Sequence, residues 1–246
     1  MFRYQILLEY DGKSFVGWQI QKKGKSVQEI VQLELSRLFK NKITIYGSGR
    51  TDKGVHAIEQ SAHFDNRIKI LDIKKKIKSL NFFLNPKNIS ILNIKKKNSN
   101  FHARYSTKER IYKYIILNRA SPPSIDKSKV WHIRKKLNIK LMKRGAKKLI
   151  GTHDFSTFRA SNCYSKSPIR TMKKITIKKS KDKIIFNFRS NSFLRNQVRS
   201  MVGCLKLLGE EKWSLEEFKS AFKAKNRSSC APPAISDGLY LEKIIY

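Results

Sequence analysis

The chain has 246 residues, 54 of them Lys or Arg and 18 Asp or Glu, which gives a formal net charge of +36. This length allows one large domain or two small ones, and an apolar content of 40% argues for a folded protein. No stretch approaches about 18 consecutive apolar residues, which excludes a membrane-spanning helix. The charge favours a polyanionic partner, nucleic acid first, although the Lys, Ile and Asn usage of an A/T-rich genome would also raise it.

The first part of the chain predicts strands interleaved with two helices. Alternating apolar residues from Phe2 to Tyr10 are typical of a half-buried strand, and the N-terminus lacks the pattern of a signal peptide. Ser26 and Glu29 form a capping-box pattern ahead of an apolar stripe at helical spacing. A later strand should turn Ile58, Ala62 and Phe64 inward. The predicted ranges are strands 2–10, 43–47, 58–65, 89–95 and 108–118, and helices 26–40 and 72–84.

The second part begins with a Pro-containing segment, 119–129, which is the best candidate for a linker. We therefore predict an N-terminal α+β lobe at 1–118 that carries the Gly-rich loop described next, and a C-terminal α+β lobe at 119–246. Runs of adjacent, antiparallel strands separated by helices indicate an α+β fold rather than a doubly wound one. Predicted here are helices 138–151, 192–209 and 214–223, two strands around a turn at 181–182, and a final strand at 238–246.

The segment "GSGRTDKGVHA" (47–57) is predicted to join two strands. It is not a dinucleotide-binding loop, because Asp52 stands where the third glycine belongs and no helix follows. The segment Gly12-Lys13-Ser14 is not a Walker A motif either, since Leu7 occupies the place of its first glycine.

Asp52 has two interpretations at this point. Asp and Gly are common turn residues, so Thr51 to Gly54 is explained by an ordinary tight turn. However, a turn does not need Arg50, and a carboxylate on a basic surface would repel nucleic-acid phosphate. A neighbouring guanidinium lowers the pKa of a carboxyl group, and an ionised carboxylate can act as a nucleophile or a base.

Cysteine and histidine spacing predicts no metal site. The three cysteines lie far apart without a C-x-x-C pair, which argues against a disulfide framework or a thiolate zinc site and favours a reducing cytoplasm. The five histidines lack ligand spacing. We expect no metal and no cofactor.

The same loop closely resembles the R-T-D-x-G-V-H-A motif of the bacterial TruA-type tRNA pseudouridine synthases. Further blocks resemble that family in the same order along most of the chain, which makes the resemblance highly specific. These blocks are "YDGKSFVGWQIQ" with "SVQEIVQLEL", "FHARYSTKERIYKYII", "GTHDFSTFR", "NSFLRNQVRSMVG" and "APPAISDGLYL".

The resemblance implies a function for four residues. Asp52 matches the family's essential aspartate, which attacks the sugar or promotes a glycal-type intermediate while uridine is detached, rotated and rejoined through carbon. Tyr112 matches the tyrosine that stacks on the target base, and Tyr114 is expected to pack inward. Arg199 matches the arginine that pairs with the catalytic carboxylate, and Arg50 the one that helps to hold or replace the extruded nucleotide. Without a role in the reaction, Tyr112 would be an aromatic residue of the core, and Arg199 would be a solvated residue on a helix.

The resemblance also implies two ferredoxin-like lobes around a central mixed or antiparallel sheet, a homodimer, and tRNA as partner, modified in the anticodon arm at uridines 38, 39 and 40. Two departures stand out: Lys53 occupies a position where the family usually has Ala, and 228–236 matches its Ala/Pro-rich segment only loosely.

Two other classes of function compete with the enzyme. A non-catalytic RNA-binding or RNA-chaperone protein would explain the charge and the ferredoxin-like pattern. A metal-dependent nuclease would need clustered acids, whereas the 18 acidic residues are scattered.

Overall fold

The computed structural model describes all residues from 1 to 246 and has ten strands and five α-helices. Most strand pairs are antiparallel, whereas β10 (Leu239–Ile245) runs parallel to β3 (His56–Asn66) and β5 (Glu109–Asn118) runs parallel to β6 (Trp131–Ile133). The predicted α+β class with a mixed sheet is therefore confirmed. None of the helices combines the length and the apolarity that a membrane crossing requires.

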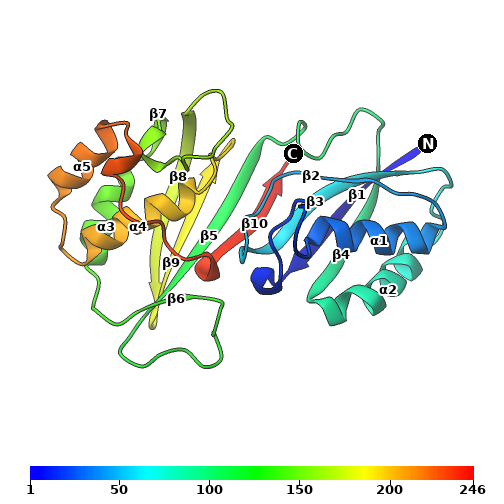
Figure 1. Cartoon of the computed structure of the whole chain (residues 1–246), viewed down its shortest axis with the longest axis horizontal. Coiled ribbons are helices and arrows are strands. Elements are labelled where there is room, and N and C mark those ends of the chain that lie inside the picture. Colours follow the sequence, from blue (N-terminus) through cyan, green and yellow to red (C-terminus); the bar gives the residue numbers. More distant parts are fainter. The chain divides into compact units, whose positions relative to one another are not determined.

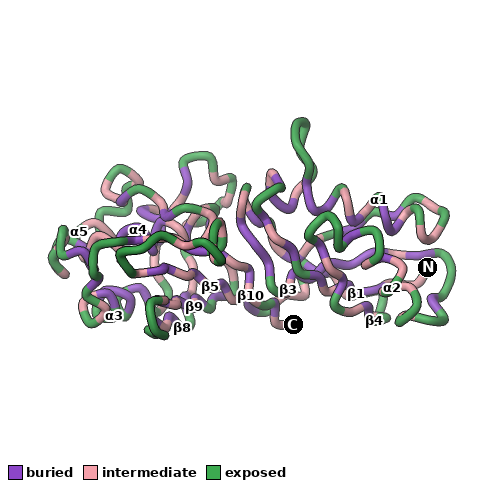
Figure 2. The backbone as a smooth tube through the Cα atoms, turned by 90° about the horizontal axis from the view of Figure 1, so that it is seen from below, coloured by how far each residue is buried: buried purple, intermediate pink, exposed green.

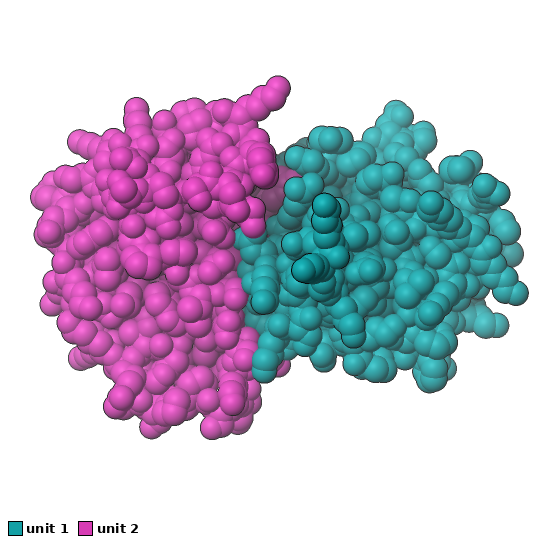
Figure 3. All heavy atoms as spheres, in the orientation of Figure 1, with its two compact units in different colours: residues 1–108, 240–246 teal, residues 109–239 magenta.

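Two compact units make up the chain, drawn in different colours in Figure 3. Unit 1 contains residues 1–108 and 240–246, and unit 2 contains residues 109–239. The sequence instead suggested a division after residue 118. The difference arises because β5 pairs along its length with β9 (Lys183–Ser190) of unit 2, while the last strand pairs with β3 of unit 1.

Unit 1 has the β-α-β-β-α-β order of a ferredoxin-like fold. Its antiparallel strands lie in the order β4-β1-β3, with β2 paired to β3, and β10 adds a short parallel pairing at the start of β3. Figure 1 shows the two helices lying together on the same sheet. The remaining bounds are β1 (Phe2–Tyr10), α1 (Val27–Phe39), β2 (Ile45–Gly47), α2 (Ile73–Leu84) and β4 (Ile89–Lys97).

The alternation seen in the sequence of β1 creates the core of unit 1. The side chains of Tyr4, Ile6 and Leu8 are almost wholly buried, and the apolar stripe of α1 covers them. Figure 2 shows the two sides of α1 as alternating buried and exposed stretches of the tube. The hydroxyl of Ser26 accepts a hydrogen bond from the backbone N–H of Glu29, so the helix begins where its capping residue predicts.

The predicted inward face of β3 is correct for Ala62 and Phe64 and wrong for Ile58, which is 38% exposed. The cause is an irregularity in the β1–β3 pairing. Leu8 lies opposite Gln60, but Tyr10 lies opposite Ala57, so β3 has one extra residue between these pairs. A β-bulge of this kind changes which side chains face the core.

Unit 2 repeats a β-α-β-β sequence of elements, with strand order β5-β9-β8-β7 and β6 paired to β5. Its three helices pack against one another (Figure 1). The second ferredoxin-like lobe stays a prediction, because the elements of unit 2 follow one another as β5, β6, α3, β7, β8, β9, α4 and α5. The remaining bounds are α3 (Ile139–Lys147), β7 (Gly151–Asp154), β8 (Ile169–Ser180), α4 (Gln197–Gly209) and α5 (Leu215–Lys223).

Two predicted helix boundaries in unit 2 are wrong. The second helix of this unit, α4, begins at Gln197 rather than at 192, because Asn196 has a φ of 62°, outside the right-handed helical region. The first, α3, ends at Lys147, four residues before the glycine expected to stop it; that glycine, Gly151, opens β7 instead. Strands β6 and β7 were not predicted.

Candidate active site

Asp52 lies in unit 1, on the loop 48–55 that joins β2 to β3, as predicted. We call this segment the carboxylate loop. The Asp52 side chain is half-buried, while Arg50 and Lys53 on either side of it are exposed. The backbone N–H of Val55 donates to the carbonyl of Asp52 at 3.1 Å, and Gly54 has a φ of 77°. The backbone from Thr51 to Gly54 therefore forms the predicted tight turn, and Asp52 lies at its bend.

Buried hydrogen bonds from the segment 10–18 hold the carboxylate loop. The hydroxyl groups of Tyr10 and Thr51 lie 2.8 Å apart, and the backbone N–H of Trp18 donates to the carbonyl of Thr51 at 3.1 Å. Farther along, the N–H of Gly54 donates to the carbonyl of Phe15 at 3.4 Å. The residue before Asp52 is thus bonded through both its side chain and its backbone.

Two glycines of the same segment allow the two backbones to approach closely. A Cβ atom at Gly17 would lie 2.4 Å from the carbonyl oxygen of Thr51, and this glycine has a φ of 120° that other residues rarely adopt. A Cβ atom at Gly12 would lie 2.1 Å from the carbonyl oxygen of Val55. Larger side chains at either position would displace the carboxylate loop.

The N-terminal end of the loop is bonded to β3. The backbone N–H of Ser48 donates to the carbonyl of Ser61 at 2.8 Å, and the buried side-chain amide of Gln60 donates to the carbonyl of Gly49 at 2.8 Å. Both sides of Asp52 are therefore attached to other elements of unit 1. A loop held in this way can present a side chain in one position, which catalytic geometry demands.

Tyr112 lies in unit 2, on β5, and only 8% of its surface is exposed. Its ring packs edge-on against Phe193, with 5.0 Å between centroids. Tyr114, two residues along, is fully buried and donates its hydroxyl to the carbonyl of Ile235 at 2.8 Å. Burial raises the pKa of Tyr114 well above its ordinary value. The expectation that Tyr114 packs inward is confirmed.

Arg199 also lies in unit 2, in the first turn of α4, and is half-buried. Its Nε donates to the carbonyl of Ala234 at 2.6 Å, and its own backbone carbonyl accepts from the N–H of Ala234 at 3.0 Å. Its Nη1 lies 3.4 Å from the side-chain oxygen of Asn196. Hydrogen bonds to Ala234 and Asn196 therefore fix the Arg199 side chain, which is not freely solvated.

The four predicted site residues thus lie in pairs, Arg50 and Asp52 in unit 1, and Tyr112 and Arg199 in unit 2. Reasoning from the sequence missed the residues that support the carboxylate loop, namely Tyr10, Gly12, Gly17 and Trp18. All four residues lie in the block "YDGKSFVGWQIQ", which resembles the family, and this resemblance could have identified them as supporting residues.

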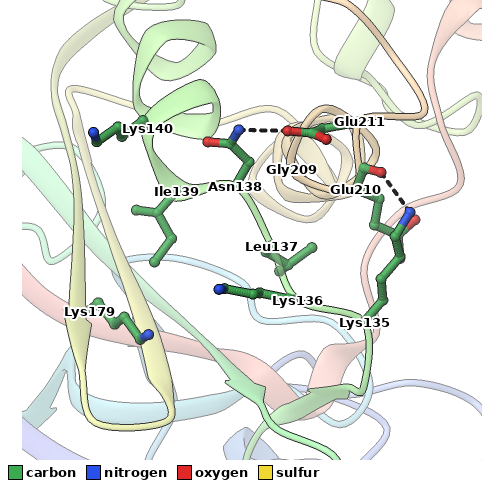
Figure 4. A pocket seen from close by; sticks show the side chains of 10 residues that line it. All are labelled: Lys135, Lys136, Leu137, Asn138, Ile139, Lys140, Lys179, Gly209, Glu210 and Glu211. Carbon is green, nitrogen blue, oxygen red and sulfur yellow. Dashed lines mark hydrogen bonds between the residues drawn. The ribbon is translucent and has the colours of Figure 1, made fainter.

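A cavity of about 450 Å³ lies elsewhere in unit 2. Figure 4 shows the amine groups of Lys136 and Lys179 pointing toward one another, whereas Lys140 points away. None of the predicted site residues lines this cavity. Its lining is Lys135, Lys136, Leu137, Asn138, Ile139, Lys140, Lys179, Gly209, Glu210 and Glu211.

Comparison with known proteins gives the chain a family. The tRNA pseudouridine synthase family matches residues 6–106 and 146–246, most of the chain. A remote likeness to an archaeal box H/ACA sRNP Nop10-Cbf5 complex, at 9% identity, covers 92% of this chain and 59% of the other; its TM-score of 0.36 is too low to support an argument.

Curated relatives match from end to end. A tRNA pseudouridine synthase A of Pelagibacter ubique is 60% identical over 246 residues and covers 100% of both chains. A protein of the same name from Maricaulis maris is 39% identical over 246 residues, covering 100% of this chain and 98% of the relative. The chain therefore belongs to the tRNA pseudouridine synthase family, isomerases that convert uridine in tRNA to pseudouridine.

Proposed function

We propose that this enzyme isomerises uridines 38, 39 and 40 in the anticodon arm of tRNA, and that Asp52 is its catalytic residue. The observation that carries the proposal is the carboxylate loop. Buried bonds fix the backbone on both sides of Asp52, while the carboxylate itself is only half-buried and has two exposed cations beside it in the chain. The resemblance of this loop to the family motif supports the assignment.

The reaction requires one ionised carboxylate and no net gain or loss of atoms. The bond between the ring nitrogen and the sugar breaks, the detached base rotates, and a carbon of the base forms the new bond to the sugar. That carbon loses a proton and the ring nitrogen gains one. Asp52 either attacks the sugar or promotes a glycal-type intermediate, and both routes are lost when the carboxylate becomes an amide.

Three other residues are proposed to bind the substrate nucleotide. A base inside a folded RNA must leave its stack to reach an enzyme group, and aromatic rings hold such bases by stacking. We assign this role to Tyr112, the nucleotide-holding role to Arg50, and the pairing with the catalytic carboxylate to Arg199. Tyr112→Phe should keep most of the activity, whereas Tyr112→Leu should lose about 5- to 150-fold, the range that stacking on one base covers.

The test of the function uses a bulk tRNA pool, in which each pseudouridine is mapped to its nucleotide before and after treatment with the enzyme. The wild-type chain should produce pseudouridine at positions 38 to 40 without a change in mass. Asp52→Asn should produce none and should bind tRNA with unchanged affinity, measured separately. Conversion at other positions would refute the anticodon-arm assignment, and conversion by Asp52→Asn would refute the catalytic role.

The competing function, non-catalytic RNA binding, makes the opposite prediction for the wild-type chain. It requires tRNA binding without any product, and it requires that binding be indifferent to Asp52→Asn. The family membership favours the enzyme, and the mapping experiment separates the two in a single preparation.

We further propose that the enzyme is a cytoplasmic homodimer, as the family resemblance implies. Light scattering of the purified chain without tRNA should then give twice the mass of one chain. A mass equal to that of a single chain at micromolar concentration would contradict the dimer without affecting the assignment of Asp52.

A further inference from the structure

The side chains of two of the three cysteines are in contact in unit 2. The sulfur atoms of Cys204, on α4, and Cys230, on the segment that precedes β10, lie 3.5 Å apart, which is van der Waals contact. Cys204 is 1% exposed and Cys230 is half-buried, so one sulfur lies within the core and the other on its outer side. Both are free thiols. A disulfide bond has a length near 2.05 Å, so its formation needs an approach of about 1.5 Å.

The surroundings make the two thiols unequal. The hydrogen bond from Cys204 and, to a smaller extent, the positive charge of Arg227 lower the pKa of Cys230 against the opposing effect of burial. Contact with Cys230, together with burial, raises the pKa of Cys204. Arg227 lies close by, since its Nη1 is 3.4 Å from the Cys230 carbonyl, and the N–H of Ala231 donates to the Cys204 sulfur at 3.3 Å. Cys230 is thus the sulfur suited to react first, because the thiolate is the nucleophile.

We propose that Cys204 and Cys230 form a reversible thiol-oxidation site, in which Cys230 reacts with hydrogen peroxide and Cys204 completes a disulfide. The proposal rests on the placement of the two sulfurs and does not depend on the assignment of Asp52.

The chemistry balances in two steps. The Cys230 thiolate attacks one oxygen of hydrogen peroxide, the O–O bond breaks, and a sulfenic acid and a hydroxide ion result. The Cys204 sulfur then attacks the Cys230 sulfur, the S–O bond breaks, and the departing hydroxide takes the Cys204 proton as water. Two electrons pass from the sulfurs to the peroxide. The first step also removes the Cys230 anion, one of the causes that raise the pKa of Cys204.

The bridge would attach the segment 230–234 covalently to α4. This segment already packs closely on the helix, since a Cβ atom at Gly203 would lie 2.2 Å from the carbonyl of Pro232. It also carries Ala234, which is bonded to Arg199 through two hydrogen bonds. Oxidation is therefore expected to restrict the backbone that holds Arg199, and amide exchange of Ala231, Ala234 and Ile235 should slow in the oxidised chain.

The experiment treats the full chain with a small excess of hydrogen peroxide, stops the reaction with catalase, and alkylates the remaining thiols after denaturation. Intact mass should show one alkylated cysteine instead of three, and digestion should give a peptide pair linked through residues 204 and 230. Dithiothreitol should restore all three thiols. The variant Cys163→Ser is the matched control and should form the same bridge.

Two variants test the order of events. Cys230→Ala, at a half-buried position, should form no bridge at the same peroxide dose. Cys204→Ala should leave a sulfenic acid on Cys230 that dimedone traps, whereas the wild-type chain should give little dimedone adduct. Three alkylated thiols after treatment, a bridge that includes Cys163, or disulfide-linked pairs of chains would each overturn the proposal.

Discussion

Two turns of this molecule contain the same kinds of residue and are supported in different ways. The carboxylate loop of unit 1 and the turn between β8 and β9 of unit 2 each join antiparallel strands. Each places an aspartate beside a lysine, Asp52 with Lys53 and Asp182 with Lys181. Each also contains a residue of positive φ, Gly54 at 77° in the first and Lys181 at 50° in the second.

The turn in unit 2 is a short hairpin, and one backbone hydrogen bond reaches it from outside β8 and β9, from the N–H of Asn118 to the carbonyl of Asp182 at 2.7 Å. Ser180 pairs with Lys183, so only two residues form the bend, and the Asp182 side chain is 55% exposed with an ion pair to Arg119 at 3.7 Å. The carboxylate loop is longer and receives buried hydrogen bonds from Tyr10, Trp18 and Gln60. The comparison teaches that turn chemistry and one outside hydrogen bond suffice for an exposed bend, whereas buried hydrogen bonds on both flanks mark a bend that has to hold one position.

Gly17→Ala should break this support most severely. The added Cβ would lie 2.4 Å from the Thr51 carbonyl oxygen, and alanine would be strained at a φ of 120°. Strain and overpacking together should cost about 4 kcal/mol of unfolding free energy, measured by urea denaturation. Lys181→Gly in the other turn is the control and should stabilise by about 0.5 kcal/mol through relief of positive φ. Equal, small effects of the two changes would contradict the comparison.

Acid should weaken the strand that carries the carboxylate loop. Burial, followed by the charges of His102 and Arg3, lowers the pKa of His63 on β3 from 6.5 to about 4. The native state therefore favours the neutral ring, so the contribution of His63 is complete above pH 6.5 and is lost as the pH falls through 4. The loss should approach about 3 kcal/mol in the opening free energy of β3 amides, measured by hydrogen exchange.

The control for acid sensitivity is His63→Gln. This variant should lack the fall in the opening free energy of β3 amides that the wild-type chain shows between pH 6.5 and 4. The β8–β9 hairpin contains no histidine and should respond much less over the same interval. An identical pH response of β3 in the wild-type chain and in His63→Gln would refute the assignment to His63.

Tyr10→Phe removes one buried hydroxyl from the support of the carboxylate loop. The Thr51 hydroxyl, 2.8 Å away, then loses this partner. Loss of a buried hydrogen bond should cost about 1.5 kcal/mol of stability and should lower the turnover rate more than the affinity for tRNA. Thr51→Val in the Tyr10→Phe background should add less than its separate effect, because the two side chains share the bond. Full additivity would argue against the coupling.

Lys53→Ala should have the smallest effect. Lys53 is exposed, and the resemblance implies an alanine at its position, so we expect Lys53 to contact phosphate rather than to act in the reaction. Its loss should weaken tRNA binding by less than about tenfold. The slope of the logarithm of the binding constant against the logarithm of the salt concentration should fall by at most the contribution of one phosphate contact. A large loss of turnover at saturating tRNA would instead place Lys53 in the chemistry.

The sequence predicted the features that depend on neighbouring residues. Ser26 caps α1, the alternation of β1 buries Tyr4 to Leu8, and Asp52 lies on a bend between strands. Features that depend on distant residues could not be predicted in this way.

Ile58 is exposed because of a bulge that arises only in the pairing with β1. Cys204 and Cys230 meet because the segment after α5 folds back on α4, and their separation in the chain gives no sign of it. The bonds from Tyr10 and Trp18 to Thr51 likewise join residues far apart in the sequence.

The most direct test of the central claim compares Asp52→Asn with Asp182→Asn, the same substitution in the two turns. Pseudouridine formation is measured in a single turnover, with enzyme in excess over tRNA, and tRNA affinity is measured in parallel. Asp52→Asn should lose activity by about 10⁴-fold or more with unchanged affinity, and Asp182→Asn should match the wild-type chain. Product formation by Asp52→Asn at a rate within tenfold of the wild-type rate would contradict the account.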